Sequence, residues 1–485
     1  MDISLYISVL ALIISIGVPF FEYIYNKSFN NINIEVSYYD EIYKDYLINK
    51  IPISRMKIQL SDHFTYRRLL RFVFPSILMI LCTSVYSIVD GFFVSNFAGK
   101  TPFAALNLII PVLMGVGCIG FMLGTGGSAV IARTLGEGKP KLANEYFTML
   151  VFAAFLGGFI ISVLGFIFTP QIASLLGATG ELKRYCVIYA RILFCSAPSF
   201  VLQYVFQSFF VAAQKPELSL RINISAGIAN IILDYLLIVV FDLGLAGAAI
   251  ATAVGEYIGG LTPVFYFCRK NNSLLQFTKL KFHGKILLQA CANGCSEMVT
   301  NLSTSLVNIL YNFQLMNIAG ENGVAAYGIV MYINIVFMAI YLGYSIGSAP
   351  IVSYHYGAGN HPELKNMLNK SLRLISITGV SLLVLSELLS RPLVLIFANY
   401  DADLLAMTVH GFRLYAIAFL IMGFNVWGSS FFTALNNGIV SACISFLRTL
   451  VFQAAAILIL PVLFGINGIW LSIVAAESLA VLVTF

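Results

Sequence analysis

Charged residues are scarce in this chain, and their scarcity excludes most classes of soluble protein. Only 10% of the 485 residues are Asp, Glu, Lys or Arg, whereas a soluble protein carries about 25%. Hydrophobic residues make up 59% of the chain, and the mean hydropathy is +0.89. The composition therefore indicates a membrane protein. The formal net charge of +6 comes from basic residues in the loops between apolar runs, so we expect no nucleic-acid partner.

Sequence motifs for ATP hydrolysis and for metal binding are also missing. The Gly-rich stretch Gly136–Lys139 is followed by Pro140 and does not have P-loop spacing. The five His residues show no ligand spacing, and the eight Cys residues include no CxxC pair. We therefore expect no metal site and no cofactor. A membrane-embedded enzyme would need a nucleophile, a base or a metal constellation, and the sequence shows none.

Long apolar runs are abundant and predict twelve transmembrane helices. A basic linker at 269–286 separates six runs in an N-terminal lobe, 56–268, from six in a C-terminal lobe, 287–485. The predicted fold is an all-α membrane protein of two six-helix bundles. The runs lie near 71–95, 102–132, 145–169, 185–213, 217–241, 244–268, 287–316, 322–355, 371–398, 405–434, 438–463 and 465–485.

The distribution of basic residues predicts the orientation of these helices in the membrane. Lys and Arg concentrate in alternate loops, among them 67–71, 133–141 and 269–285, and few lie in the opposite set. Because basic loops stay in the cytoplasm, the 269–286 linker is predicted to be cytoplasmic. We expect a multi-pass protein of the inner (cytoplasmic) membrane, surrounded by the lipid bilayer.

The two lobes repeat one another at an offset of about 221 residues. Asn96–Gly99 aligns with Asn317–Gly320, Gly136 with Gly357, and Glu256 with Glu477. Six spans per lobe is an even number, so both lobes enter the membrane from the same side and are parallel repeats. Transporters with a substrate site between two such bundles work by alternating access.

The two ends of the chain depart from the repeat. Residues 1–55 have no counterpart, and their apolar segment 3–22 could form an extra N-terminal helix. This segment lacks a basic n-region, which argues against a cleaved signal peptide. Met56 is a possible alternative start, and the extension is predicted to be dispensable for transport. The last helix stops before the position equivalent to Cys268, so the repeat predicts that it is clipped.

Carboxylates inside apolar segments are the strongest candidates for ion coupling, since an isolated charge in lipid is costly. Asp90 lies in the outer part of the first core helix, and Asn230 and Asp234 share a face of the fifth. Asp234 and Thr252 are each nine residues from the turn between helices five and six, which places both about 13 Å deep. These four residues are predicted to form one cation or proton site. The alternative is ordinary helix–helix hydrogen bonding.

Other polar side chains are weaker candidates, for lining a substrate cavity. Some of them make the seventh helix unusually polar, and Glu256 has its repeat partner in Glu477, which also fits a shared structural role. The candidate cavity residues are Tyr86, Glu256, Glu297, Asn301, Thr304 and Asn308.

From about Met56 to its end, the chain resembles the multidrug and toxic compound extrusion (MATE) family. The resemblance rests on the segments 88–94, 124–129, 132–138, 230–234 and 350–359. It implies two lobes in a V, antiport of drugs against H⁺ or Na⁺, and an ion site in the first lobe at Asp90, Asn230, Asp234 and Thr252. Thr83 departs from the family pattern, which can have Gln there.

The sequence therefore predicts a monomeric secondary active antiporter that exports small cationic organic compounds in exchange for H⁺ or Na⁺. One alternative is a flippase for a lipid-linked glycan precursor, which would favour a cationic cavity for pyrophosphate. A membrane-embedded enzyme is the alternative from another class.

Overall fold

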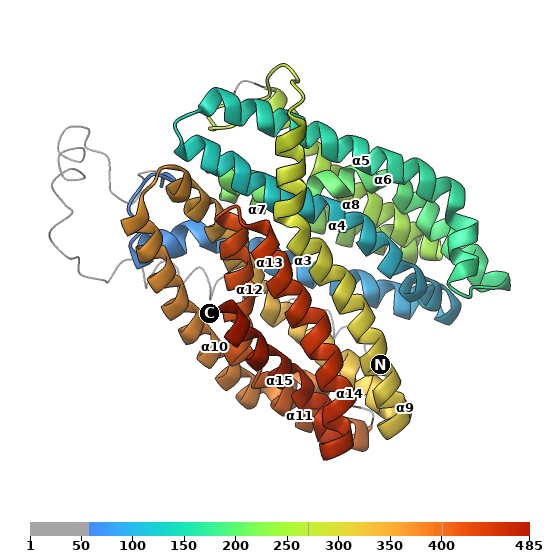
Figure 1. Cartoon of the computed structure of the whole chain (residues 1–485). Helices are drawn as coiled ribbons and strands as arrows, with labels where there is room; N and C mark the ends of the chain where they lie inside the picture. Colours follow the sequence, from blue (N-terminus) through green and yellow to red (C-terminus); the bar gives the residue numbers. More distant parts are fainter. Residues whose placement is uncertain (1–57, 270, 400) are drawn as a thin grey trace. The chain divides into compact units, whose positions relative to one another are not determined.

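The computed structural model describes residues 58–269, 271–399 and 401–485, and all regular structure within them is helical. The predicted extra helix at 3–22 lies outside the described residues. Residues Leu60–Phe485 form one compact unit (Figure 1).

The first lobe contains six spans, and proline begins two of them. Pro140 and Pro216 stand in the first turn of their helices, where the missing N–H costs nothing. Two π-helical segments, η3 (Val94–Ala98) and η4 (Tyr235–Val240), extend the first and fifth spans. The helices are α3 (Tyr66–Phe93), α4 (Lys100–Gly136), α5 (Pro140–Leu175), α6 (Gly180–Ala212), α7 (Pro216–Asp234) and α8 (Gly244–Cys268).

The second lobe repeats this arrangement with one bent span and one merged pair. α11 and α12 meet at a bend of 51° and form one span, and the π-helical segment η5 (Leu447–Phe452) joins α13 to α14. The helices are α9 (Gly284–Gly357), α10 (His361–Ala398), α11 (Ala402–Ala416), α12 (Phe419–Ala434), α13 (Gly438–Phe446), α14 (Gln453–Phe464) and α15 (Ile466–Thr484).

Helix α9 contains two spans that are separated at Gly320. This glycine has φ 62° and ψ −152°, a conformation that disfavours residues with a Cβ. Its repeat counterpart Gly99 has φ 99° and ends the first span in the same way. Counting α9 as two spans and α11–α12 as one gives the twelve transmembrane helices that the sequence predicted, so that prediction is confirmed.

The lipid-facing surface is best seen on α5. Large apolar side chains along this helix are about half exposed, as expected where lipid tails replace water. They include Phe152, Phe155, Phe159, Ile160, Leu164 and Ile167. On its other face, Phe147 packs in the first-lobe core against Phe206, Phe209 and Phe267.

The linker between the lobes is held against the cytoplasmic end of α5. The Lys281 ammonium lies 2.6 Å from the Glu145 carboxylate, and the backbone N–H of Gln276 donates to the Asn144 side chain over 3.0 Å. The linker ends where α9 begins, at Gly284, three residues before the lobe boundary predicted at 287.

The lobes contact each other closely at the cytoplasmic ends of their helices. A Cβ on Gly136 would lie 2.0 Å from the carbonyl oxygen of Tyr354, and one on Gly357 would lie 2.0 Å from that of Arg133. Gly136 and Gly357 are repeat partners, so this α4–α9 contact is reciprocal between the two lobes. Only glycine allows backbones to approach so closely. The cytoplasmic side of the lobe interface is therefore closed.

A polar cluster adds to this closure. Glu363, near the start of α10, accepts a hydrogen bond from the backbone N–H of Phe64 over 2.9 Å and lies 2.5 Å from the His63 ring nitrogen. The Lys370 ammonium donates to the Phe64 carbonyl over 2.6 Å. These contacts tie the segment before α3 in the first lobe to α10 in the second.

Candidate functional site

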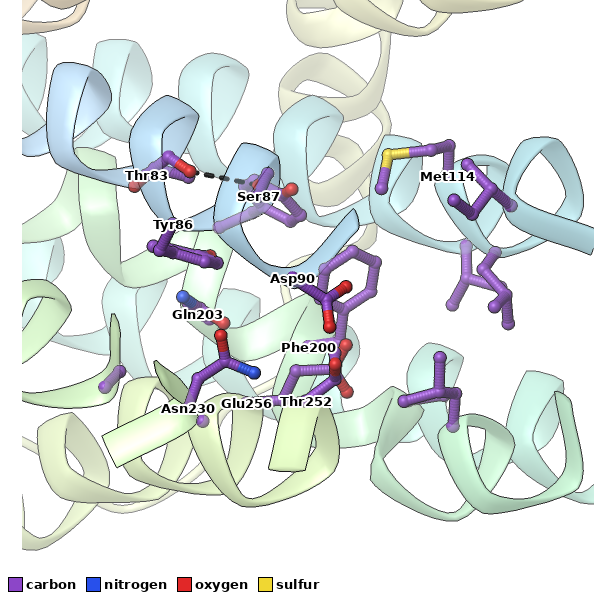
Figure 2. Close-up of a pocket in the computed structure, with 18 of the residues that line it drawn as sticks. Thr83, Tyr86, Ser87, Asp90, Met114, Phe200, Gln203, Asn230, Thr252 and Glu256 are labelled. Carbon is purple, nitrogen blue, oxygen red and sulfur yellow. Dashed lines mark hydrogen bonds between the residues drawn. The ribbon is translucent and has the colours of Figure 1, made fainter. Parts of the chain in front are cut away.

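A cavity of about 170 Å³ lies inside the first lobe, between α3, α4, α6, α7 and α8 (Figure 2). Pockets for drug-sized ligands usually measure about 300–1,000 Å³, so this one suits an ion with water, or the head group of a larger molecule. Its lining residues are Thr83, Tyr86, Ser87, Asp90, Ile110, Leu113, Met114, Val116, Tyr189, Leu193, Ala197, Phe200, Gln203, Tyr204, Ala226, Asn230, Thr252, Gly255 and Glu256.

Three of the four predicted ion-coupling residues line this cavity. Asp90 enters it from α3, Asn230 from α7 and Thr252 from α8, as Figure 2 shows. One carboxylate oxygen of Asp90, the amide oxygen of Asn230 and the hydroxyl of Thr252 are buried without a hydrogen-bond partner. The structure therefore brings these residues together with their oxygen atoms unsatisfied.

Asp234, the fourth predicted residue, lies beside the cavity and is not part of its lining. Its side chain is completely buried, and both of its carboxylate oxygens lack a hydrogen-bond partner. It lies within electrostatic range of Asp90. Asp234 is also the last α-helical residue of α7, directly before the π-helical segment η4. Such π-helical turns are frequent at functional sites.

These four side chains together have five buried oxygen atoms without a hydrogen-bond partner. Two of the side chains, those of Asp90 and Asp234, are carboxylates. Each buried unsatisfied polar atom costs roughly 1–3 kcal/mol, and a charged one costs more. A hard monovalent cation such as Na⁺ could be coordinated by these oxygens, because oxygen is the ligand that hard cations prefer. A bound proton would instead neutralise one of the two carboxylates. Within the described residues, no cluster of three or more His, Cys, Asp or Glu side chains could hold a metal ion.

Two residues from the weaker set, Tyr86 and Glu256, line the same cavity. The Tyr86 ring packs over Gly227, where an added Cβ would lie 3.0 Å from the ring. The Glu256 carboxylate accepts a hydrogen bond of 2.5 Å from the Ser196 hydroxyl, and no ion pair to Glu256 occurs in the described part of the chain. The cavity thus contains an acidic group at a second position.

The site predicted from the sequence included no residue of α6. Gln203, Tyr189, Phe200 and Tyr204 all line the cavity from this helix. The available signal was Gln203 with Gln207, two amides one turn apart in an otherwise apolar run. Both amides donate to the side-chain oxygen of Asn223, over 3.3 and 3.2 Å.

The remaining candidates lie on α9 in the second lobe and do not join this cavity. The exposed Thr304 hydroxyl donates to the Thr300 carbonyl of its own helix, and the Asn301 amide donates to the Glu297 carbonyl. Asn308 accepts a 2.8 Å hydrogen bond from the Tyr327 hydroxyl. Their assignment to a substrate cavity stays a prediction.

Comparisons with known proteins agree with the repeat and the fold. The MatE family model matches the chain twice, at residues 75–236 and 297–459, once in each lobe. The multidrug export protein MepA of Staphylococcus saprophyticus is 24% identical over 86% of this chain and 92% of its own length. MepA of Staphylococcus haemolyticus is 25% identical over 85% of this chain and 91% of its own length.

Two solved structures have similar folds. One is described as MATE in complex with MaL6, and it matches with a TM-score of 0.82 and 22% identity over 86% of this chain and 94% of the other. The second is the outward-facing conformation of a multidrug resistance MATE family transporter of the MOP superfamily. It matches with a TM-score of 0.82 and 22% identity over 86% of this chain and 93% of the other.

Proposed function

Because the chain belongs to the MatE family of membrane transporters, we propose that it is a secondary active antiporter that exports small cationic organic compounds in exchange for H⁺ or Na⁺. The protein is a multi-pass protein of the inner (cytoplasmic) membrane. The observation that carries the proposal is the group of buried, unpartnered oxygens of Asp90, Asn230, Asp234 and Thr252 in the first lobe.

Such a group can couple the movement of an ion to that of a substrate. When it is empty, the buried carboxylates are unpaired and costly, so the site favours either a proton or a cation. A cationic substrate in the same acidic cavity would compete with the coupling ion. Antiport results if the two ligands favour different conformations of the lobes. The closed cytoplasmic contact at Gly136 and Gly357 fits one of these conformations.

The size of the cavity limits how a substrate could bind. About 170 Å³ has room for an ion and water, or for a cationic head group, but not for a whole drug-sized molecule. The rest of such a substrate would have to lie outside the cavity. Since one chain contains both lobes, we expect a monomer to be sufficient for transport.

The charge of the cavity argues against a flippase for a lipid-linked glycan. A pyrophosphate group needs Lys or Arg donors, and no basic side chain is found among the described residues that line the cavity. Asp90 and Glu256 line it instead, with Asp234 beside it. This distribution favours a cationic ligand.

Transport by the purified protein in proteoliposomes tests the proposal. A fluorescent organic cation is followed while a pH gradient and a Na⁺ gradient are imposed separately. We expect movement of the cation against its gradient under at least one of the two. Absence of gradient-driven movement under both, with the protein correctly inserted, would contradict antiport.

A further inference from the structure

The second lobe provides an internal comparison for the first-lobe cavity. Helices α7 and α13 align at an offset of 222 residues, and equivalent contacts fix this register. Gln207 bonds to Asn223 over 3.2 Å in the first lobe, and the equivalent Ser429 and Ser445 hydroxyls lie 3.0 Å apart in the second. Residues can therefore be compared position by position between the lobes.

In the second lobe, the carboxylate equivalent to Glu256 is neutralised by an arginine. The Arg448 Nε donates to both carboxylate oxygens of Glu477, over 2.8 and 3.0 Å. The side-chain amide of Asn425 donates to one of the same oxygens over 2.6 Å. All three side chains are buried, so this ion pair is a fixed part of the second lobe.

In the first lobe, the arginine is replaced by Ala226. Gln203 occupies the position of Asn425, and Ala226, Gln203 and Glu256 all line the cavity. Glu256 keeps a hydrogen bond from the Ser196 hydroxyl, but no Lys, Arg or His is among the described residues that line the cavity. The cavity therefore opens at the position that Arg448 fills in the other lobe, and an acidic group remains there.

We propose that Glu256 binds the guanidinium or amidinium head group of an organic cation, in the position that the Arg448 side chain occupies in the second lobe. The inference rests on the proposed function and names the substrate class that its cavity recognises. A planar head group with two N–H donors matches the carboxylate geometry. The aromatic rings of Tyr86, Phe200 and Tyr204 line the same cavity and can stabilise a cation through their faces.

This subsite is distinct from the predicted ion site. Glu256 lies four residues after Thr252 on α8, one turn deeper, which is about 6 Å along the helix axis. Glu256 has the Ser196 hydroxyl as a partner, whereas the Thr252 hydroxyl and both Asp234 oxygens have none. The ion site and the head-group site are thus neighbouring positions of one cavity. A cation at one position disfavours a cation at the other, because like charges repel.

Binding of methylguanidinium to the purified full-length protein tests the proposal. We expect saturable binding that raises the melting temperature of the wild type. Glu256→Gln should weaken this binding about tenfold or more, because the charged acceptor is lost. Tetramethylammonium has the same charge but no N–H donor, and it should bind about tenfold more weakly than methylguanidinium. Equal binding of the two cations would overturn the proposed head-group chemistry.

Two substitutions at one position separate charge from bulk. Ala226→Arg supplies the second-lobe arginine and should abolish methylguanidinium binding, whereas Ala226→Met, with similar bulk and no charge, should weaken it less. Equal binding by both variants would contradict the proposal. If Ala226→Arg does not fold, the comparison of Glu256→Gln with wild type still decides the question.

The test of the Glu256 subsite can be distinguished from the test of the proposed antiport function. Asp242→Asn changes an exposed carboxylate in the outer turn between α7 and α8, so it should keep both methylguanidinium binding and gradient-driven export. If Glu256→Gln binds methylguanidinium as the wild type does, and gradient-driven export persists, the subsite is wrong and antiport stands. If Glu256→Gln loses binding and the wild type shows no gradient-driven export, the subsite stands and antiport is wrong.

Discussion

Asp234→Asn removes a carboxylate that the first lobe buries completely, with no hydrogen-bond partner for either of its oxygens. Asp234 contributes two of the five unpartnered oxygens, so at roughly 1–3 kcal/mol per atom its empty state costs about 2–6 kcal/mol. Asparagine keeps the size, removes the charge and adds an N–H donor. We therefore expect the ion-free variant to be at least as stable as the ion-free wild type, with a smaller stabilisation by ions.

The effect on transport follows from the coupling free energy. Coupling between two ligands is typically about 1–3 kcal/mol, or about 5–150-fold in affinity. Asp234→Asn should reduce gradient-driven export by a factor in this range. Asp90→Asn should have the same effect, because Asp90 contributes an unpartnered carboxylate oxygen to the same predicted site. The double variant should be little worse than either single one, since neighbouring residues of one site are not additive.

Two measurements check this prediction. Export is followed in proteoliposomes under separate pH and Na⁺ gradients, and the melting temperature is followed as a function of pH and Na⁺. Asp242→Asn is the matched control, because Asp242 is exposed in the outer turn between α7 and α8. Wild-type export by Asp234→Asn under both gradients, together with an unchanged melting response to ions, would refute the assignment of the coupling site.

Three further predictions concern the lobe interface, the second lobe and the N-terminal extension. Gly136→Leu should prevent the cytoplasmic contact between the lobes, since even a Cβ would lie 2.0 Å from a carbonyl oxygen. Export should therefore fall sharply. Gly328→Ala is the control, because no atom lies close to an added Cβ there. Arg448→Ala leaves the buried Glu477 carboxylate without its cationic partner and should lower the free energy of unfolding by about 3–5 kcal/mol. Denaturation measures this loss, and adding Glu477→Gln should recover part of it. A chain starting at Met56 should export like the full chain, and loss of export despite normal insertion would contradict this.

The sequence by itself determined the features that depend on local spacing. Apolar runs must match the thickness of the bilayer, and basic loops stay in the cytoplasm, so the twelve spans and their orientation followed from composition. The constant offset between the lobes revealed the repeat. Helical spacing predicted that Asn230 and Asp234 share a face of α7, and both are buried in the structure.

The tertiary structure alone decided which buried polar groups have partners. Glu256 and Glu477 occupy equivalent positions in the two lobes. Glu477 is paired with Arg448, whereas Glu256 lines a cavity. The rotation of each helix about its axis and the side chains of its neighbours decide this, and they are non-local. For the same reason, Asp234 lies beside the cavity, whereas Gln203 and Tyr204 of α6, which belong to no predicted site, line it.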